Sequence, residues 1–174
     1  PNPDFTGGLN NYMEYKGFDL NVLLSFVYGN KVFNGGGRYQ SANADWFDNQ
    51  TADQLNRWQN PGDITDVPQA RLGESNGINT SSRYLSDASY LRVRNINLGY
   101  NLPTRLVNRM KLSATRIYIG VQNLYTFTKY KGWDPEVNYT GTGRSTQNTN
   151  IIQGYDFYTA PQARTYTIGI NLSF

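Results

Sequence analysis

The chain has 174 residues and contains neither cysteine nor histidine. Without cysteine there can be no disulfide and no thiolate metal site. Without histidine the commonest general base and the commonest metal ligand are both missing. No run of about 18 apolar residues occurs, which excludes a transmembrane helix. The sequence begins with neither methionine nor a signal peptide, so we expect a processed chain or a piece of a longer one.

The net charge is only +3, from 16 Lys and Arg against 13 Asp and Glu, and these charges are dispersed. This argues against a nucleic-acid partner. Aromatic residues make up 14% of the chain, and its 17 glycines suit strands and turns. The hydrophobic fraction of 38% fits a soluble protein, but it also fits a membrane barrel, in which only alternate strand residues need be apolar.

The last twelve residues, from Ala163 to Phe174, alternate strictly between apolar and polar side chains. This period of two indicates a strand with one apolar and one polar face. The strand could close a membrane barrel, with its apolar face in lipid and its last aromatic residue at the interface. It could also be a half-buried strand of a soluble β-sandwich. The apolar face consists of Tyr166, Ile168, Ile170, Leu172 and Phe174.

Four further segments show strand periodicity, near residues 5–15, 18–28, 84–102 and 115–128. Short connections at 16–17 and 103–114 alternate with long ones at 29–83 and 129–162. In an up-and-down sheet, both long connections therefore leave from one end. Outer-membrane barrels have short periplasmic turns and long extracellular loops. The sequence predicts an all-β fold, an antiparallel up-and-down transmembrane β-barrel.

Two strands depart from the simple pattern. Arg92 and Arg94 share the parity of the apolar residues Ile96 and Leu98, so we expect residues 90–94 to stand above the bilayer. Asn123 interrupts the apolar face of 115–128, and either a bulge or a local polar contact could explain it. Within the first long loop, a short helix is expected near residues 51–58.

Five strands cannot close a barrel, for which about eight are needed. The first and last strands would each leave a long unpaired edge. We therefore expect residues 1–174 to be the C-terminal segment of a larger barrel, whose other strands and plug lie elsewhere.

Four segments resemble the SusC/RagA-type TonB-dependent transporters. They are Ser86 to Tyr100, Val121 to Glu136, Pro161 to Phe174 and the opening Pro3 to Leu9. The resemblance covers most strand regions and leaves the two long loops uncovered. It implies a barrel of about 22 strands with an N-terminal plug, in the outer membrane of a Bacteroidetes-type bacterium.

The resemblance also implies a function and partners. The transporter would import oligosaccharides or peptides, with a SusD-like surface lipoprotein as a lid and TonB as the energy source. TonB would act through an N-terminal part that this chain lacks. The other partners would be the rest of the barrel, its plug and outer-membrane lipid.

Candidate site residues are few, and no catalytic group, metal site or cofactor is expected. Asp134 and Glu136 read as a turn rather than a carboxylate pair, and 62–66 lacks the spacing of a calcium loop. Loop aromatics could contact substrate or lid, or could pack the loops. They are Trp46, Phe47, Trp58, Trp133, Tyr139, Tyr155, Phe157 and Tyr158. By resemblance, the apolar face of the last strand, Tyr166 to Phe174, would be a barrel-assembly signal.

Three other classes compete with the transporter. A soluble secreted glycan-binding β-sandwich would pack its apolar faces sheet on sheet. A self-contained small barrel or adhesin would need at least three more strands. An enzyme is the least favoured class, because histidine, cysteine and suitably paired acids are missing.

Overall fold

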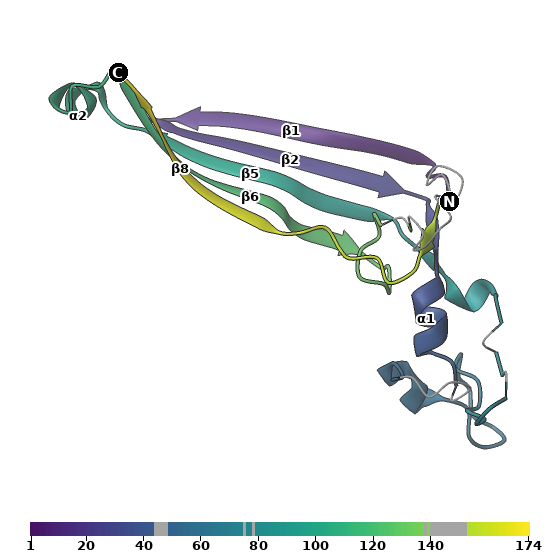
Figure 1. Ribbon diagram of the computed structural model, residues 1–174. Coiled ribbons are helices and arrows are strands. Elements are labelled where there is room, and N and C mark those ends of the chain that lie inside the picture. Colours follow the sequence, from purple (N-terminus) through teal and green to yellow (C-terminus); the bar gives the residue numbers. More distant parts are fainter. Residues whose placement is uncertain (44–48, 75, 78, 138, 140–152) are drawn as a thin grey trace, which may run out of the picture. The chain divides into compact units, whose positions relative to one another are not determined.

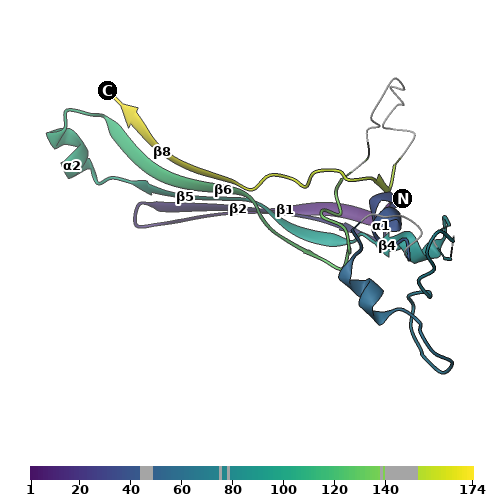
Figure 2. The same ribbon diagram turned by 60° about the horizontal axis from the view of Figure 1, so that its bottom comes forward.

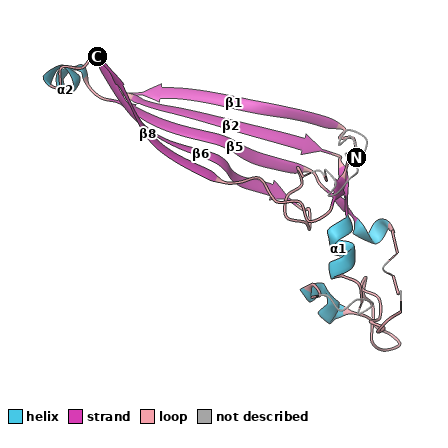
Figure 3. Ribbon diagram, viewed as in Figure 1, coloured by secondary structure: helices cyan, strands magenta, loops and turns pink. Residues whose placement is uncertain are grey.

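The computed structural model describes residues 1–43, 49–74, 76–77, 79–137, 139 and 153–174. By its internal contacts the chain divides into two compact units. The sheet unit comprises residues 3–29, 89–129 and 161–174, and the loop unit comprises 1–2, 30–88 and 130–160. Figure 3 shows strands dominating the sheet unit and loops dominating the loop unit. Among the described residues, none of the helices has the length and apolar character that a membrane span requires.

The sheet unit is built from five strands in the order β1-β2-β5-β6-β8. Their bounds are β1 Phe5–Tyr15, β2 Phe18–Tyr28, β5 Tyr90–Asn101, β6 Ala114–Thr128 and β8 Thr165–Ser173. Every neighbouring pair is antiparallel. The strands lie side by side in chain order in both views (Figures 1 and 2). The predicted antiparallel up-and-down arrangement is therefore confirmed.

The pairing register places most apolar side chains of the five strands on one face, with Leu23 and Val27 of β2 as exceptions. Because side chains alternate between faces, directly paired residues share a face. One row across the sheet is Met13, Leu20, Leu98, Ile119 and Ile168. The next row is Tyr15, Phe18, Tyr100, Ile117 and Ile170. We call this surface the apolar face.

The assignment of Arg92 to the apolar face is wrong, because β5 contains a bulge that the sequence periodicity conceals; the position of residues 90–94 above the bilayer stays a prediction. Leu23 pairs with Asn95 and Leu24 with Val93, so Arg94 is the extra residue. A bulge shifts the parity of everything beyond it. Arg92 consequently pairs with Ser25 on the polar face, where it is 1% exposed.

The interruption at Asn123 has both of the causes that the sequence left open. Asn123 has a φ of 51° and lies where the β5–β6 register shifts. Its side-chain amide donates to the carbonyl of Ala163 at 3.0 Å, and its Oδ1 accepts from Arg94 at 3.5 Å. The two irregular strands therefore meet at one polar contact.

The connections follow the expected alternation at the two ends of the sheet. Both long connections begin at the end where Val27, Tyr90 and Thr128 are paired. At the opposite end, β1 turns into β2 through Lys16 and Gly17, both with positive φ. The β5–β6 connection there contains a helix, α2 (Thr104–Arg109), which the sequence reading missed.

The loop unit has its own small sheet, in the order β4-β3-β7. Its strands are β3 Lys31–Asn34, β4 Leu85–Asp87 and β7 Tyr155–Asp156. Its helices are the α-helix α1 Gly35–Gln40 and the 3-10 helices η1 Ala52–Asn56 and η2 Ser82–Tyr84. The helix expected near 51–58 corresponds to η1. Two expectations are wrong here. β3 lies in the segment 29–83, which was expected to be a long loop, and the expected strand 84–102 is divided into β4 and β5. Pairing between distant short segments creates β3, β4 and β7, and a local period cannot reveal it.

Candidate functional site: the polar face and the aromatic cluster

The polar face of the sheet is the surface opposite the apolar face. One of its rows consists of Tyr12, Asn21, Asn97, Gly120 and Thr167. The next consists of Glu14, Asp19, Gly99, Tyr118 and Gly169. Amide, hydroxyl and carboxylate groups thus follow one another across all five strands.

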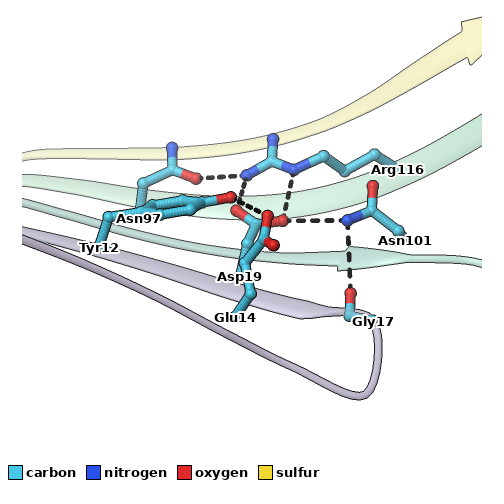
Figure 4. Close-up of polar contacts among 7 residues, drawn as sticks. All are labelled: Tyr12, Glu14, Gly17, Asp19, Asn97, Asn101 and Arg116. Atoms are coloured by element: carbon cyan, nitrogen blue, oxygen red, sulfur yellow. Dashed lines mark hydrogen bonds and ion pairs between the residues drawn. The ribbon is translucent and has the colours of Figure 1, made fainter.

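An ion pair between Asp19 of β2 and Arg116 of β6 spans this face (Figure 4). Arg116 Nε donates to Asp19 Oδ2 at 2.8 Å, and its Nη2 donates to Asp19 Oδ1. The same Nη2 also donates to Asn97 Oδ1 at 2.9 Å. Asp19 is 6% exposed, so this bidentate pairing compensates a nearly buried carboxylate. The pair ties two strands that are not neighbours.

Gly99 makes this cross-strand contact possible. It lies on β5 between Asp19 and Tyr118, directly in the path of the Arg116 side chain. A Cβ at position 99 would overlap the guanidinium of Arg116. Gly169 has the same role for Tyr118, whose ring occupies the space that a Cβ at 169 would need.

Further polar contacts surround the ion pair. Asn101 donates to Asp19 Oδ2 and to the carbonyl of Gly17, each at 3.4 Å. Tyr12 donates its hydroxyl to Glu14. Together these groups line an open polar hollow formed by Tyr12, Asp19, Asn21, Asn95, Asn97, Asn101 and Arg116. Amides and a phenol can hydrogen-bond a passing solute or another protein segment.

The hollow has no groups suited to covalent chemistry, and the described residues contain no cluster of three acidic side chains that could hold a metal ion. Asp19 is already engaged by Arg116. What the arrangement offers is a fixed, hydrogen-bonding wall.

The loop unit contains an aromatic cluster in which four predicted site residues meet. Tyr155 stacks on Phe33 with ring centroids 5.7 Å apart, and Tyr139 meets Tyr155 edge-on at 5.7 Å. Phe157 extends the cluster to its other members. The cluster consists of Phe33, Tyr39, Tyr84, Tyr139, Tyr155, Phe157 and Tyr158. Phe33, Tyr39 and Tyr84 are members that sequence reasoning missed, although Phe33 and Tyr39 each lie two residues from the Gly35–Gly37 run.

A buried hydrogen bond between Tyr130 and Asp156 stabilises the loop unit. Tyr130 donates its hydroxyl to Asp156 Oδ2 at 2.8 Å, and both residues are buried. Burial, together with the hydrogen bond to Asp156, raises the pKa of the Tyr130 phenol far above its ordinary value. Tyr130 therefore stays protonated and packs with Val32 and Ala88 as the core of the unit.

The remaining predicted loop residues do not belong to the aromatic cluster. Trp133 is 67% exposed, and with Tyr158 it lines a small polar cavity beside Gln40 and Lys131. Trp58 is half-buried and donates its backbone N–H to Val67. Trp46 and Phe47 lie outside the described residues. Contact of any of these side chains with substrate or lid stays a prediction.

Four of the predicted assembly residues, Tyr166, Ile168, Ile170 and Leu172, lie on the apolar face of β8, and Phe174 follows the strand. Ile168 is 78% exposed and Phe174 is 93% exposed. Within the described residues β8 pairs only with β6, and β1 only with β2. The sheet therefore presents an open edge on either side and an uncovered apolar face.

Comparisons with known proteins agree with this geometry. No family model matches the chain. It is 40% identical over 174 residues to TonB-dependent receptor P3 of Formosa agariphila, covering 100% of this chain and 17% of the relative. It is 30% identical over 178 residues to TonB-dependent receptor SusC of Bacteroides thetaiotaomicron, covering 100% and 15%. The solved RagAB peptide importer matches 99% of this chain and 17% of its own, at 31% identity and a TM-score of 0.77.

The uncovered apolar face, the polar face and these relatives define the chain as part of the barrel of a TonB-dependent outer-membrane transporter. It spans 15–17% of the length of the relatives it matches. The chain belongs to the SusC/RagA type of this class. The relatives are named as receptors and an importer rather than as enzymes, as the sequence predicted.

Proposed function

We propose that this chain forms part of the wall of a TonB-dependent importer that carries oligosaccharides or peptides across the outer membrane. The single observation that supports this most is the register, which puts lipid-compatible side chains on one face and hydrogen-bonding groups on the other. The apolar face contacts lipid, and the polar face lines the interior, against solute or plug.

In this proposal the loop unit lies outside the cell and the short connections lie in the periplasm. A SusD-like lipoprotein closes the barrel from above, and TonB acts through a part of the transporter that this chain lacks. Trp133 and Tyr158 are the loop aromatics that we expect to contact lid or substrate, because their side chains are exposed whereas those of Tyr155 and Phe157 are half-buried.

The proposal is tested by purifying the transporter from outer membranes with a tag in the exposed 60–64 turn. We expect a surface lipoprotein to copurify, and loss of the gene to abolish growth on one class of oligomer, glycan or peptide, while growth on the monomers continues. Unchanged growth on both oligomer classes, with no copurifying lipoprotein, would refute the proposal.

The last strand has a second proposed role, as the segment that the barrel-assembly machinery recognises. Removing Phe174 is expected to lower the amount of inserted transporter more than the transport per inserted molecule. The control is removal of the polar Ser173 side chain by S173A. Equal membrane levels of the Phe174 deletion, S173A and the parent would contradict this role.

A further inference from the structure

The β5–β6 connection combines a short helix with an unusual side-chain arrangement. Val107 is 2% exposed and fixes α2 to the end of the sheet. Leu106 and Met110, one helical turn apart, are 47% and 48% exposed. Arg105 and Arg109 form a second exposed row beside them. The connection thus has one buried side, at Val107, and an exposed side on which an apolar row lies beside a cationic row.

The charge of this segment is of one sign. From Leu102 to Thr115 the sequence contains Arg105, Arg109 and Lys111 but no acidic residue. In the described part of the chain, none of these three cations forms an ion pair. Three solvated cations beside an exposed apolar row suit a surface that is apolar below and anionic above.

The connection that contains α2 joins β6 next to a residue of the apolar face. Thr115 pairs with Leu172, so it belongs to the apolar face, yet it is only 6% exposed. Backbone hydrogen bonds hold both ends of the connection: Leu102 donates to Thr115, and Ser113 donates to Ser173. Leu106 and Met110 are thus exposed apolar side chains in the connection directly after the last paired residues of β5.

Aromatic rings mark the level of the membrane interface at this same end. Tyr15, Phe18 and Tyr100 lie in the last apolar row, with the Phe18 and Tyr100 rings 4.5 Å apart. Tyrosine and tryptophan side chains gather at the headgroup level of membranes. The cations of α2 follow this row along the chain, so in the proposed membrane orientation they would lie near the level of the lipid phosphates.

We propose that α2 and the adjoining Lys111 bind the phosphate of an anionic phospholipid headgroup. Arg105, Arg109 and Lys111 contact the phosphate, while Leu106 and Met110 insert at the boundary with the acyl chains. The lipid site rests on the proposed function, in which the short connections lie on the periplasmic side of the membrane. There α2 would lie beside the inner leaflet of the outer membrane. The site would hold an annular lipid and fix the depth of the barrel end.

The first test compares lipid retention by native mass spectrometry of the complete transporter with phosphatidylglycerol or phosphatidylcholine added. Removing both helical cations, by R105Q with R109Q, should weaken retention of phosphatidylglycerol about 10- to 30-fold. The matched control, K129Q with R164Q, removes two exposed cations at the opposite end and should leave retention unchanged. Equal phosphatidylglycerol retention by both variants would overturn the proposal, and so would retention of lipopolysaccharide in its place.

A second test separates this site from the proposed function. Nitroxide labels are placed at L106C and at I168C in a background without other cysteines, and collision with oxygen is compared with collision with a water-soluble nickel complex. Labels at both positions should favour oxygen. If only 168 does, the lipid site is wrong and the membrane sheet stands, whereas nickel access at both refutes the membrane sheet as well.

Discussion

The two units of this chain differ in which side chains they bury. In the sheet unit, Ile168 is 78% exposed while the charged Arg92 is 1% exposed. In the loop unit, Val32 is 3% exposed and Ala88 is fully buried, as in a water-soluble domain. The contrast shows that the loop unit supplies its own core, whereas the sheet leaves its apolar side chains exposed, as the proposed contact with lipid would require.

The largest expected effect comes from a charge on the apolar face. I119K places an ammonium in the central apolar row, and a lysine there costs about 2–4 kcal/mol at the bilayer midplane. The free energy of unfolding, measured with urea in lipid vesicles, should fall by that amount.

Two controls sharpen this comparison. T167K lies on the polar face, and I64K lies at a fully exposed position of the loop unit. Both should change the unfolding free energy by about 0.5 kcal/mol or less. A loss from T167K equal to that from I119K would mean that both faces of the sheet meet lipid, or that neither does.

A smaller effect is expected from the polar face. R116M removes the partner of Asp19 and leaves a nearly buried carboxylate uncompensated, at a cost of about 3 kcal/mol or less in a hydrated lumen. Urea unfolding in vesicles is again the measurement. G99A should imitate part of this loss without touching either charge, because the added methyl group displaces the guanidinium. If G99A is neutral, the ion pair does not depend on the cross-strand path.

The smallest effect should be confined to the loop unit. Y130F removes the donor to Asp156 and leaves a buried carboxylate oxygen less satisfied, at a cost of about 1–3 kcal/mol to that unit. Limited proteolysis should show faster cleavage in 30–88 and 130–160, with insertion of the barrel unchanged. The control is Y158F, at a half-exposed ring of the aromatic cluster. Loss of membrane insertion in Y130F would contradict the independence of the two units.

The sheet could be predicted from the sequence largely because its strands repeat one simple rule. In β2 the apolar period runs without a break, and in β1 it is interrupted only at Gly7 and Asn11; both strands have the bounds that the alternation indicated. The prediction failed where the rule is broken locally: the bulge at Arg94 moves Arg92 to the other face. A bulge leaves no mark in the period itself, although two arginines of apolar parity were a signal of it.

The loop unit could not be predicted in the same way. β3 pairs with β4, more than fifty residues along the chain, and with β7, which lies further still. The residues at the polar hollow were visible as polar alternates, but the Asp19–Arg116 pair was not, because it depends on the register and on the space that Gly99 leaves. The α2 helix was missed although Pro103 and the spacing of Leu106 and Met110 both favour one.

The most direct test of the account is cysteine accessibility along β8 in the assembled transporter. The chain has no cysteine of its own, so in a transporter without cysteines elsewhere, single substitutions from 165 to 172 report one position each. Positions 166, 168, 170 and 172 should resist a membrane-impermeant maleimide, and 165, 167, 169 and 171 should react once the lumen is opened to water. Uniform reaction at all eight positions in the native membrane would contradict a lipid-facing sheet.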